Sequence, residues 1–283
     1  MKLTTILSGY FKLDGGAMFG IVPRTLWQRV NPPDDKNLCT WAARLLLIET
    51  DDRKILIDTG MGDKQDAKFR SHFEPHGEET MLGELKKQMI DPEEITDVFL
   101  THLHFDHVGG AVKYDANGKL VPTFPNATYW SNERQWRHAL HPNMKEKASF
   151  LQENFVPLEK LGRLQFIDCQ RDKLNWLPGI DIRFAHGHTD SLMALEIQVD
   201  DRKVIYPADL LPASYFISIP WVMAYDIRPL VSMEEKTALL DEVLTENSLL
   251  FFEHDPRLEC GTLRKNEKGR IVLGEGGYLK EML

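Results

Sequence analysis

Apolar and polar residues follow one another along this chain with two different periods, and each period predicts a kind of element. Two apolar, β-branched runs, 41–50 and 54–58, are separated by a short polar turn, which predicts a β-hairpin. The same pattern returns at 193–199 and 203–206, where a second hairpin is expected. Further strands are predicted at 128–130, 164–167, 180–185 and 249–252.

Helices are predicted where apolar residues recur every three or four positions. Ser232-Met233-Glu234-Glu235 has the S-x-x-E pattern of a capping box, so we expect a helix from there to about Glu246. The other predicted helices cover 80–89, 132–140 and 143–161.

Two segments are apolar without either period. Residues 12–38 are broken by Gly and Pro, and we interpret them as a lid or a contact with a second subunit; folding back on the chain's own core is the alternative. Residues 210–229 are interpreted as the wall of an apolar substrate pocket rather than a core layer. The candidate substrate contacts are Met18, Phe19, Tyr215, Phe216, Trp221 and Tyr225.

Composition narrows the class of protein. The chain is 42% hydrophobic and 27% charged, as in an ordinary soluble globule, and its net charge of -9 argues against nucleic-acid or anionic-membrane partners. No apolar run is long enough to span a bilayer, and the start of the chain predicts a β-strand rather than a signal peptide. The three cysteines are widely spaced, which indicates free thiols and a cytoplasmic location.

The candidate chemistry lies directly after the apolar run 95–100. His102, His104 and Asp106 alternate, so an extended backbone would turn all three side chains to one side, while His107 follows where a helix is expected to begin. Such a corner can serve two adjacent metal positions, and imidazole with carboxylate suits zinc, iron, manganese or cobalt. A histidine-rich surface loop is the alternative interpretation.

The motif His102-x-His104-x-Asp106-His107 resembles the hallmark of the metallo-β-lactamase-fold hydrolases. Four more motifs follow the order of that family: Leu56-Ile57-Asp58-Thr59-Gly60, Gly187-His188-Thr189, Asp209 and His254. The resemblance implies an α/β fold, a four-layer αββα sandwich, over the single domain 1–283, with residues 12–38 as an N-terminal insert.

The resemblance also implies the ligands of two metal ions. One ion would take His102, His104 and His188. The other would take Asp106, His107 and His254, and Asp209 would bridge the two. Asp58 and His186 would support the ligands without binding metal; His186 competes with His188 for the ligand role, and His188 matches the family position.

The implied cofactor is a pair of divalent ions, preferably zinc, with iron, cobalt or manganese as alternatives. A hydroxide shared by the two ions would attack a carbonyl, and Asp106 would pass a proton to the leaving alkoxide. The implied enzyme is therefore a metal-dependent hydrolase.

The insert, the apolar loop after Asp209 and the ending Glu253-His254-Asp255-Pro256 are similar to those of N-acyl-homoserine lactonases and methyl-parathion-type hydrolases. The expected substrate is a lactone or ester with an apolar tail, foremost an N-acyl-homoserine lactone (quorum quenching), and a homodimer is the expected assembly. Pro212 stands where many lactonases have a Tyr that holds the substrate carbonyl, and Tyr215 or Tyr225 is the candidate replacement.

Three other functions stay open. An arylesterase or organophosphate hydrolase would use the same site, an iron-dependent sulfur dioxygenase relative would use one metal, and a non-catalytic binding module fits least because every ligand position is intact. A glyoxalase II is disfavoured, because only 255–283 remain after the last ligand motif, too few for its glutathione-binding domain.

Overall fold

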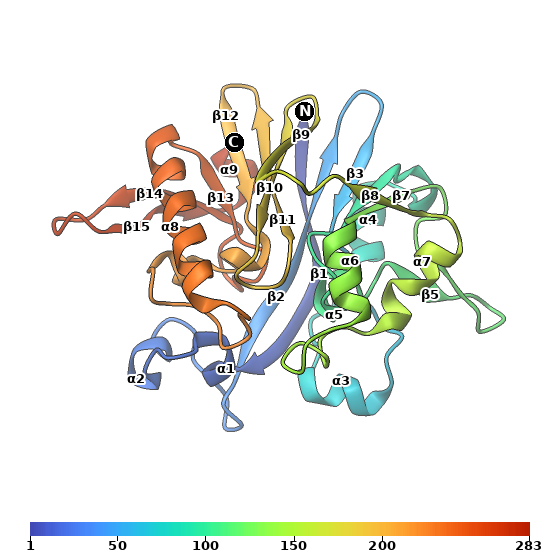
Figure 1. The fold of residues 1–283 in the computed structure, drawn as a ribbon, viewed down its shortest axis with the longest axis horizontal. Helices are drawn as coiled ribbons and strands as arrows, with labels where there is room; N and C mark the ends of the chain where they lie inside the picture. The colour runs from blue at the N-terminus through green and yellow to red at the C-terminus, as the bar shows by residue number, and fades with distance from the viewer. The chain divides into compact units, whose positions relative to one another are not determined.

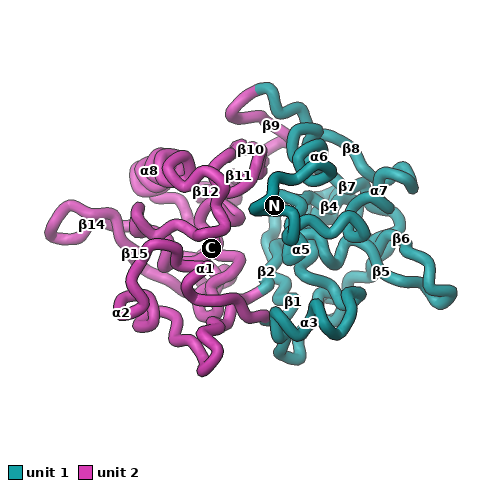
Figure 2. Tube along the Cα trace, turned by 60° about the horizontal axis from the view of Figure 1, so that its bottom comes forward, with its two compact units in different colours: residues 1–10, 43–170 teal, residues 11–42, 171–283 magenta.

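The computed structural model describes all 283 residues, whose helices and strands are drawn in Figure 1. The chain divides into two compact units (Figure 2). Unit 1 comprises Met1–Tyr10 and Ala43–Gln170, and unit 2 comprises Phe11–Ala42 and Arg171–Leu283. The single domain predicted over 1–283 stays a prediction.

Unit 1 contains most of the six-stranded sheet, which has the strand order β1-β2-β3-β4-β7-β8; the end of β1 and the start of β2 belong to unit 2. The strands of this sheet are β1 (Lys2–Asp14), β2 (Leu38–Glu49), β3 (Lys54–Ile57), β4 (Asp97–Phe99), β7 (Thr128–Asn132) and β8 (Leu164–Ile167). β2 and β3 form the predicted hairpin, with Leu46 opposite Ile57. From β3 to β8 the neighbouring strands are parallel, so the chain returns through crossovers that carry helices.

The helices of unit 1 pack on this sheet through one hydrophobic core. Met81 and Leu85 of α4, Ala139 of α6 and Leu158 of α7 belong to the same buried cluster as the strand residue Val98. The helices of this unit are α3 (Ala67–Phe73), α4 (Met81–Lys87), α5 (Phe105–Val108), α6 (Glu133–Leu140) and α7 (Val156–Lys160), and β5 (Val112–Tyr114) pairs with β6 (Leu120–Pro122).

The helix predicted over 143–161 is wrong. Residues 144–149 form turns, Gln152–Asn154 is a short 3-10 helix, and only α7 is α-helical. Pro157 explains where α7 begins, because a proline in the first turn of a helix lacks only an amide that would have no helical partner there.

Unit 2 is built on the seven-stranded sheet, which has the strand order β15-β14-β13-β12-β11-β10-β9. Its strands are β9 (Lys173–Leu177), β10 (Ile180–Ala185), β11 (Leu192–Val199), β12 (Arg202–Tyr206), β13 (Leu249–Phe251), β14 (Cys260–Lys265) and β15 (Ile271–Gly277). β11 and β12 confirm the second predicted hairpin, and β12 and β13 are parallel.

Helix α8 (Pro229–Glu246) connects β12 to β13 and packs on unit 2 through Leu239, Leu240 and Val243. It begins three residues before the predicted capping box, because Pro229 opens the helix and places Ser232 inside the first turn. The remaining helices are α1 (Gly15–Phe19), α2 (Arg24–Trp27) and α9 (Leu279–Met282).

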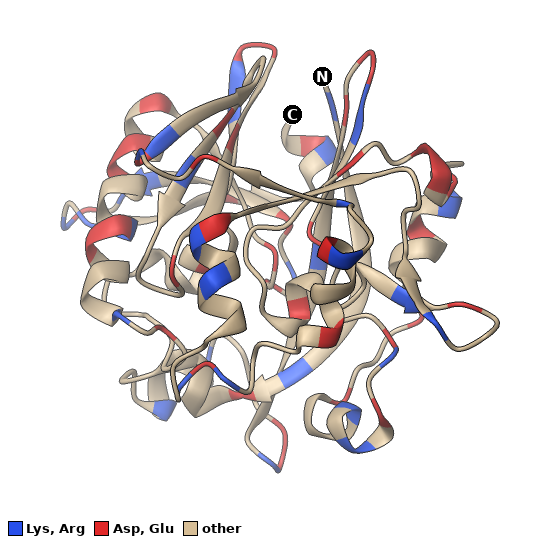
Figure 3. Ribbon diagram, turned by 45° about the vertical axis from the view of Figure 1, so that its right-hand side comes forward, with Lys and Arg blue, Asp and Glu red and all other residues tan.

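The mixed α/β fold class predicted from the sequence is confirmed. Each unit has a sheet with helices packed on it, which are the α and β layers expected of the sandwich. None of the helices has the length and apolar character needed to cross a membrane. Acidic and basic residues are interspersed along the ribbon (Figure 3), so the net charge of -9 arises from a mixture of both signs.

Candidate metal centre

The motif at 102–107 follows the buried strand β4 and turns directly into α5. His102, His104 and His107 are 0%, 5% and 0% exposed, and Asp106 is 9% exposed. The turn is tight because Gly109 packs against the backbone of unit 1: a Cβ added there would lie 1.9 Å from the carbonyl oxygen of Met61. The sequence predicted this corner from extended backbone to helix.

Three imidazoles of this motif lie together within unit 1. The ring centroids of His102 and His104 are 4.6 Å apart, and those of His102 and His107 are 3.9 Å apart. The Nδ1 atom of His102 faces Thr101 Oγ1 at 3.1 Å, and Nδ1 of His107 lies 3.0 Å from Asp58 Oδ2. Both rings therefore offer Nε2 as the candidate ligand atom.

Asp58 lies at the end of β3 and hydrogen-bonds to His107 of this motif and to Thr101 before it. Its Oδ1 accepts a hydrogen bond from the Thr101 amide at 2.8 Å, and its Oδ2 accepts one from Thr101 Oγ1 at 2.7 Å as well as facing His107. Its φ of 59° is a left-handed conformation that a non-glycine residue rarely adopts, and such strain persists where the surrounding contacts hold it. These contacts give Asp58 the geometry of a residue that orients His107.

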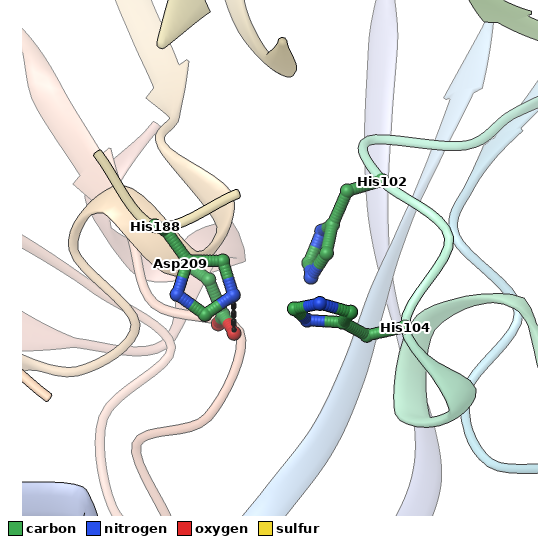
Figure 4. Close-up of side chains that lie close together, drawn as sticks. All are labelled: His102, His104, His188 and Asp209. Atoms are coloured by element: carbon green, nitrogen blue, oxygen red, sulfur yellow. Dashed lines mark ion pairs between the residues drawn. The ribbon is translucent and has the colours of Figure 1, made fainter. Parts of the chain in front are cut away.

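Unit 2 holds a second group of the expected ligands. Figure 4 draws His188 and Asp209 of this unit, joined by an ion pair, as well as His102 and His104 of unit 1. Asp209 Oδ2 lies 3.2 Å from His188 Nε2, and Asp209 Oδ1 lies 3.2 Å from His254 Nε2. Each carboxylate oxygen thus faces a different histidine, which is the arrangement expected of a bridging carboxylate.

Both histidines of unit 2 turn Nδ1 toward a fixed acceptor. The Nδ1 atom of His188 lies 3.0 Å from Asp226 Oδ1, and Nδ1 of His254 lies 2.7 Å from the carbonyl oxygen of Ala42. Each acceptor fixes the tautomer that leaves Nε2 as the ligand atom.

The loop that carries His188 is held by the first turns of α8. The Glu235 carboxylate accepts hydrogen bonds from the amides of His186 (2.7 Å) and Gly187 (3.0 Å). Burial raises the pKa of Glu235, and the two backbone hydrogen bonds oppose that rise. The ring of His186 accepts a hydrogen bond at Nδ1 from the Ser191 amide at 3.2 Å.

The seven expected ligands are therefore five histidines and two aspartates, all less than 10% exposed. Four come from unit 1 and three from unit 2. Neutral imidazoles with two carboxylates are a donor set that suits divalent zinc, iron, cobalt or manganese, and their other atoms are already oriented by neighbours.

The residues predicted to bind substrate belong to unit 2, and half of them are core residues. Met18, Phe19 and Phe216 are 2%, 0% and 1% exposed, and the rings of Phe19 and Phe216 are stacked at 5.7 Å. Tyr215, Trp221 and Tyr225 are partly exposed, and the Tyr215 hydroxyl accepts a hydrogen bond from Arg257 at 2.9 Å. A substrate role for these six residues stays a prediction.

The insert at 12–38 is partly buried as well. Met18, Phe19, Val22 and Trp27 are buried within unit 2, whereas Ile21 is 80% and Leu26 is 46% exposed. Its role as a lid or dimer contact stays a prediction.

Sequence reasoning missed the residues that support the ligands. The Nε2 atom of His138 lies 2.6 Å from the buried carboxylate of Glu146. The sequence also did not reveal that Asp226 holds His188 or that Glu235 holds the loop of His188. A charged residue inside an apolar stretch, such as Asp226 in the loop 210–229, is the only signal that the sequence offered.

The Metallo-beta-lactamase superfamily model matches residues 44–254, well over half of the chain. The N-acyl homoserine lactonase AiiA of Bacillus thuringiensis subsp. kurstaki is 23% identical over 232 residues, which are 77% of this chain and 82% of that protein.

Solved structures show the same fold. A probable metal-dependent hydrolase from Staphylococcus aureus has 25% identity and a TM-score of 0.84, and the match covers 97% of both chains. AidC, a dizinc quorum-quenching lactonase, has 21% identity and a TM-score of 0.75 over 96% of this chain and 93% of that one. The chain belongs to the metallo-beta-lactamase superfamily and is a metal-dependent hydrolase.

Proposed function

We propose that this protein opens lactone rings, with N-acyl-homoserine lactones as its substrates, at a dinuclear metal centre. One observation carries the proposal: all seven ligand positions of the family are occupied by buried His and Asp, and the curated relatives that span most of the chain are named N-acyl homoserine lactonases. The His and Asp groups together with a dizinc structural neighbour support two divalent ions, which we take to be zinc.

In this proposal the two ions would take seven protein ligands. One ion would be held by His102, His104 and His188, the other would be held by Asp106, His107 and His254, and Asp209 would be shared by both. When bound, two such cations supply a water activated at neutral pH and polarise the carbonyl that it attacks.

The protein's own groups do the rest of the chemistry. Asp106 takes the proton released at the nucleophile and delivers it to the alkoxide that leaves when the ring opens. Its place in the first turn of α5 and its 9% exposure keep that carboxylate fixed and largely shielded from water. The partly exposed rings of Tyr215, Trp221 and Tyr225 hold the apolar tail.

We also propose that the protein is a homodimer and that it is cytoplasmic. The exposed side chains of Ile21 and Leu26 in the insert support a homodimer contact, because exposed apolar side chains favour association. The three cysteines are all free, which fits a cytoplasmic protein.

The deciding experiment measures ring opening by the purified, metal-analysed protein. Short- and long-chain N-acyl-homoserine lactones are assayed beside an aryl ester and a phosphotriester, with His104→Ala as the control. We expect fast lactone opening with two metals per chain, and loss of both in the control. Two metals with ester or triester cleavage but no lactone opening would replace the lactonase by an arylesterase or organophosphate hydrolase.

The residue that holds the substrate carbonyl is tested separately. Tyr215 and Tyr225 lie in the loop after Asp209, and burial raises the pKa of Tyr215 to about 12, so its hydroxyl keeps its proton at neutral pH and can donate to a carbonyl. We expect Tyr215→Phe or Tyr225→Phe to lower kcat for lactones. Unchanged turnover in both variants would remove these tyrosines as replacements for the residue expected at Pro212.

A further inference from the structure

A buried carboxylate that is not an expected ligand, Glu146, lies beside the metal-binding motif in unit 1. It is 2% exposed, and both of its oxygens are engaged. Oε1 lies 3.2 Å from His104 Nε2; Oε2 lies 2.6 Å from His138 Nε2 and accepts a 2.6 Å hydrogen bond from Asn143 Nδ2. A carboxylate this deep is costly unless it is paired, so these contacts account for its burial.

The backbone around Glu146 is fixed by short-range hydrogen bonds. Asn143 Oδ1 accepts from the amides of Lys145 (2.9 Å) and Glu146 (3.0 Å), and the Ser149 amide donates to the Glu146 carbonyl oxygen at 2.8 Å. The Ser149 carbonyl oxygen in turn accepts from the amide of Phe105, the first residue of α5, at 2.9 Å. The segment 143–150 is thereby tied to the motif that it faces.

The aromatic ring of Phe150 packs against His104 and His138. The centroid of Phe150 lies 4.7 Å from the ring of His104 and 5.7 Å from the ring of His138. Phe150 is 5% exposed, so it excludes water from the contact between Glu146 and His104. A charged hydrogen bond is stronger in such a dry environment than in water.

His104 is oriented differently from the other histidines of the expected site. The rest turn Nδ1 to a neighbouring acceptor and offer Nε2; they are His102, His107, His188 and His254. In His104 it is Nε2 that faces Glu146, so Nδ1 is its candidate ligand atom.

We propose that Glu146, held in place by His138 and Asn143, is the positioning residue of His104: it fixes the ring with Nδ1 as the ligand atom and so strengthens metal binding. The inference rests on the proposed dinuclear site. A carboxylate that accepts the second N–H of a ligand histidine fixes its tautomer and raises its basicity, and losing such a partner typically weakens metal affinity about 10- to 100-fold.

The test measures metal affinity by competition with a chromogenic chelator, using zinc, in full-length protein. Glu146→Leu removes the acceptor, and we expect the weaker of the two zinc affinities to fall about 10- to 100-fold. Glu146→Gln keeps an amide oxygen that can accept from His104 but loses the charge, so its affinity should lie between wild type and Glu146→Leu. His138→Leu, which removes one of the two donors to Glu146 Oε2 and keeps Glu146 itself, should give a smaller loss and guards against misfolding of the Glu146 variants.

Asp97→Asn is the matched control. Asp97 is an equally buried carboxylate of unit 1 (2% exposed), but its partners are Arg53, Thr96 and Trp130, which the proposed site does not use. We expect this variant to lose thermal stability while keeping wild-type zinc affinity. A general loss of stability is thus separated from a specific loss of metal binding.

The outcomes separate this inference from the proposed function. Zinc affinity unchanged in Glu146→Leu, or reduced equally in Asp97→Asn, would overturn the role of Glu146 and leave the lactonase untouched. Two tightly bound metals without lactone opening would overturn the lactonase alone. Wild-type protein that binds no metal would overturn both.

Discussion

At the scale of single residues, most of the expected ligands have one atom that faces the site and another that is held by the protein. Asp58, Asp226 and Glu146 each face a histidine nitrogen at 3.0 to 3.2 Å. These carboxylates decide which nitrogen of each ring is the candidate ligand atom, because an imidazole that donates from one nitrogen is left with its lone pair on the other. The chemistry of the motif therefore depends on residues outside it.

The proposed bridging role of Asp209 is testable by a single change. Asp209→Asn keeps the shape of the side chain but replaces one carboxylate oxygen with an NH2 group. The two oxygens of Asp209 face His188 and His254, and an NH2 group at either position cannot bind a cation. We expect fewer than two metals per chain and a fall in kcat of at least about 100-fold, comparable to losing one electrostatic contact in an active site. Metal analysis and lactone turnover measure both; Asp201→Asn, in the exposed turn after β11, is the control and should match wild type.

At the scale of elements, α8 hydrogen-bonds to two loops of unit 2. Its first turns hold the amides of His186 and Gly187 through Glu235. The next residue, Lys236, is 1% exposed and donates to the carbonyl oxygens of Ser218 (3.1 Å) and Trp221 (2.7 Å). The helix thus fixes both the loop of His188 and the aromatic loop after Asp209.

The contact between α8 and the His188 loop leaves no room for a side chain at Gly187. A Cβ there would lie 2.3 Å from both the amide nitrogen and Oγ of Ser232, so Gly187→Ala must move the loop. We expect weaker metal binding and a lower kcat, measured by chelator competition and turnover. Gly269→Ala, at a positive φ of 73° with open space around it, strains a surface turn instead; metal binding impaired equally in both variants would contradict this explanation.

The buried Lys236 makes stability depend on pH. Burial lowers its pKa from 10.5 to about 7, although Asp226 opposes the shift. Below about pH 7 both folded and unfolded chains hold the proton; above it the folded chain releases the proton while the unfolded chain keeps it, so the free energy of unfolding rises with pH. This contribution amounts to at most about 1.4 kcal/mol per pH unit.

Urea unfolding of metal-free protein at pH 7, 8 and 9 measures that dependence. Lys236→Met lacks the titrating amine, so the wild type should gain stability relative to the variant as the pH rises. Parallel pH profiles for the two proteins would show that the amine is not the titrating group.

At the scale of the whole molecule, seven buried polar ligands come from a chain whose two units each have their own sheet and helices. Buried pairs of carboxylate and imidazole are by themselves a weak source of stability, because the cost of removing them from water offsets most of their attraction. A ligand that binds only the folded chain adds stability by mass action, about 4 kcal/mol at a thousand times its Kd.

Removal of metal should therefore lower the melting temperature. For a chain of this size about 4 kcal/mol corresponds to roughly 10 °C, and scanning calorimetry before and after dialysis against a chelator measures the shift. Zinc added back should restore it. An unchanged melting temperature would mean that the folded chain does not bind the metal.

The sequence by itself determined the candidate ligands and both hairpins. The spacing of His102, His104, Asp106 and His107 after an apolar run is local, and so is the alternation that predicts β2 with β3 and β11 with β12. Local patterns can be read from a chain because extended backbone and helix have fixed periods. Local patterns also indicate the type of chemistry, because the candidate ligands are His and Asp and these side chains limit which metals can bind.

Only the tertiary structure decided how those ligands are held. Glu146 lies 42 residues from His104 along the chain, Asp58 lies 49 from His107, and Asp226 lies 38 from His188. The sequence predicts a helix over 143–161, but residues 144–149, which include Glu146, form turns in the structure. Contacts across such separations depend on the packing of whole elements, which no local period records, and it is this packing that sets which nitrogen of each histidine can bind a metal.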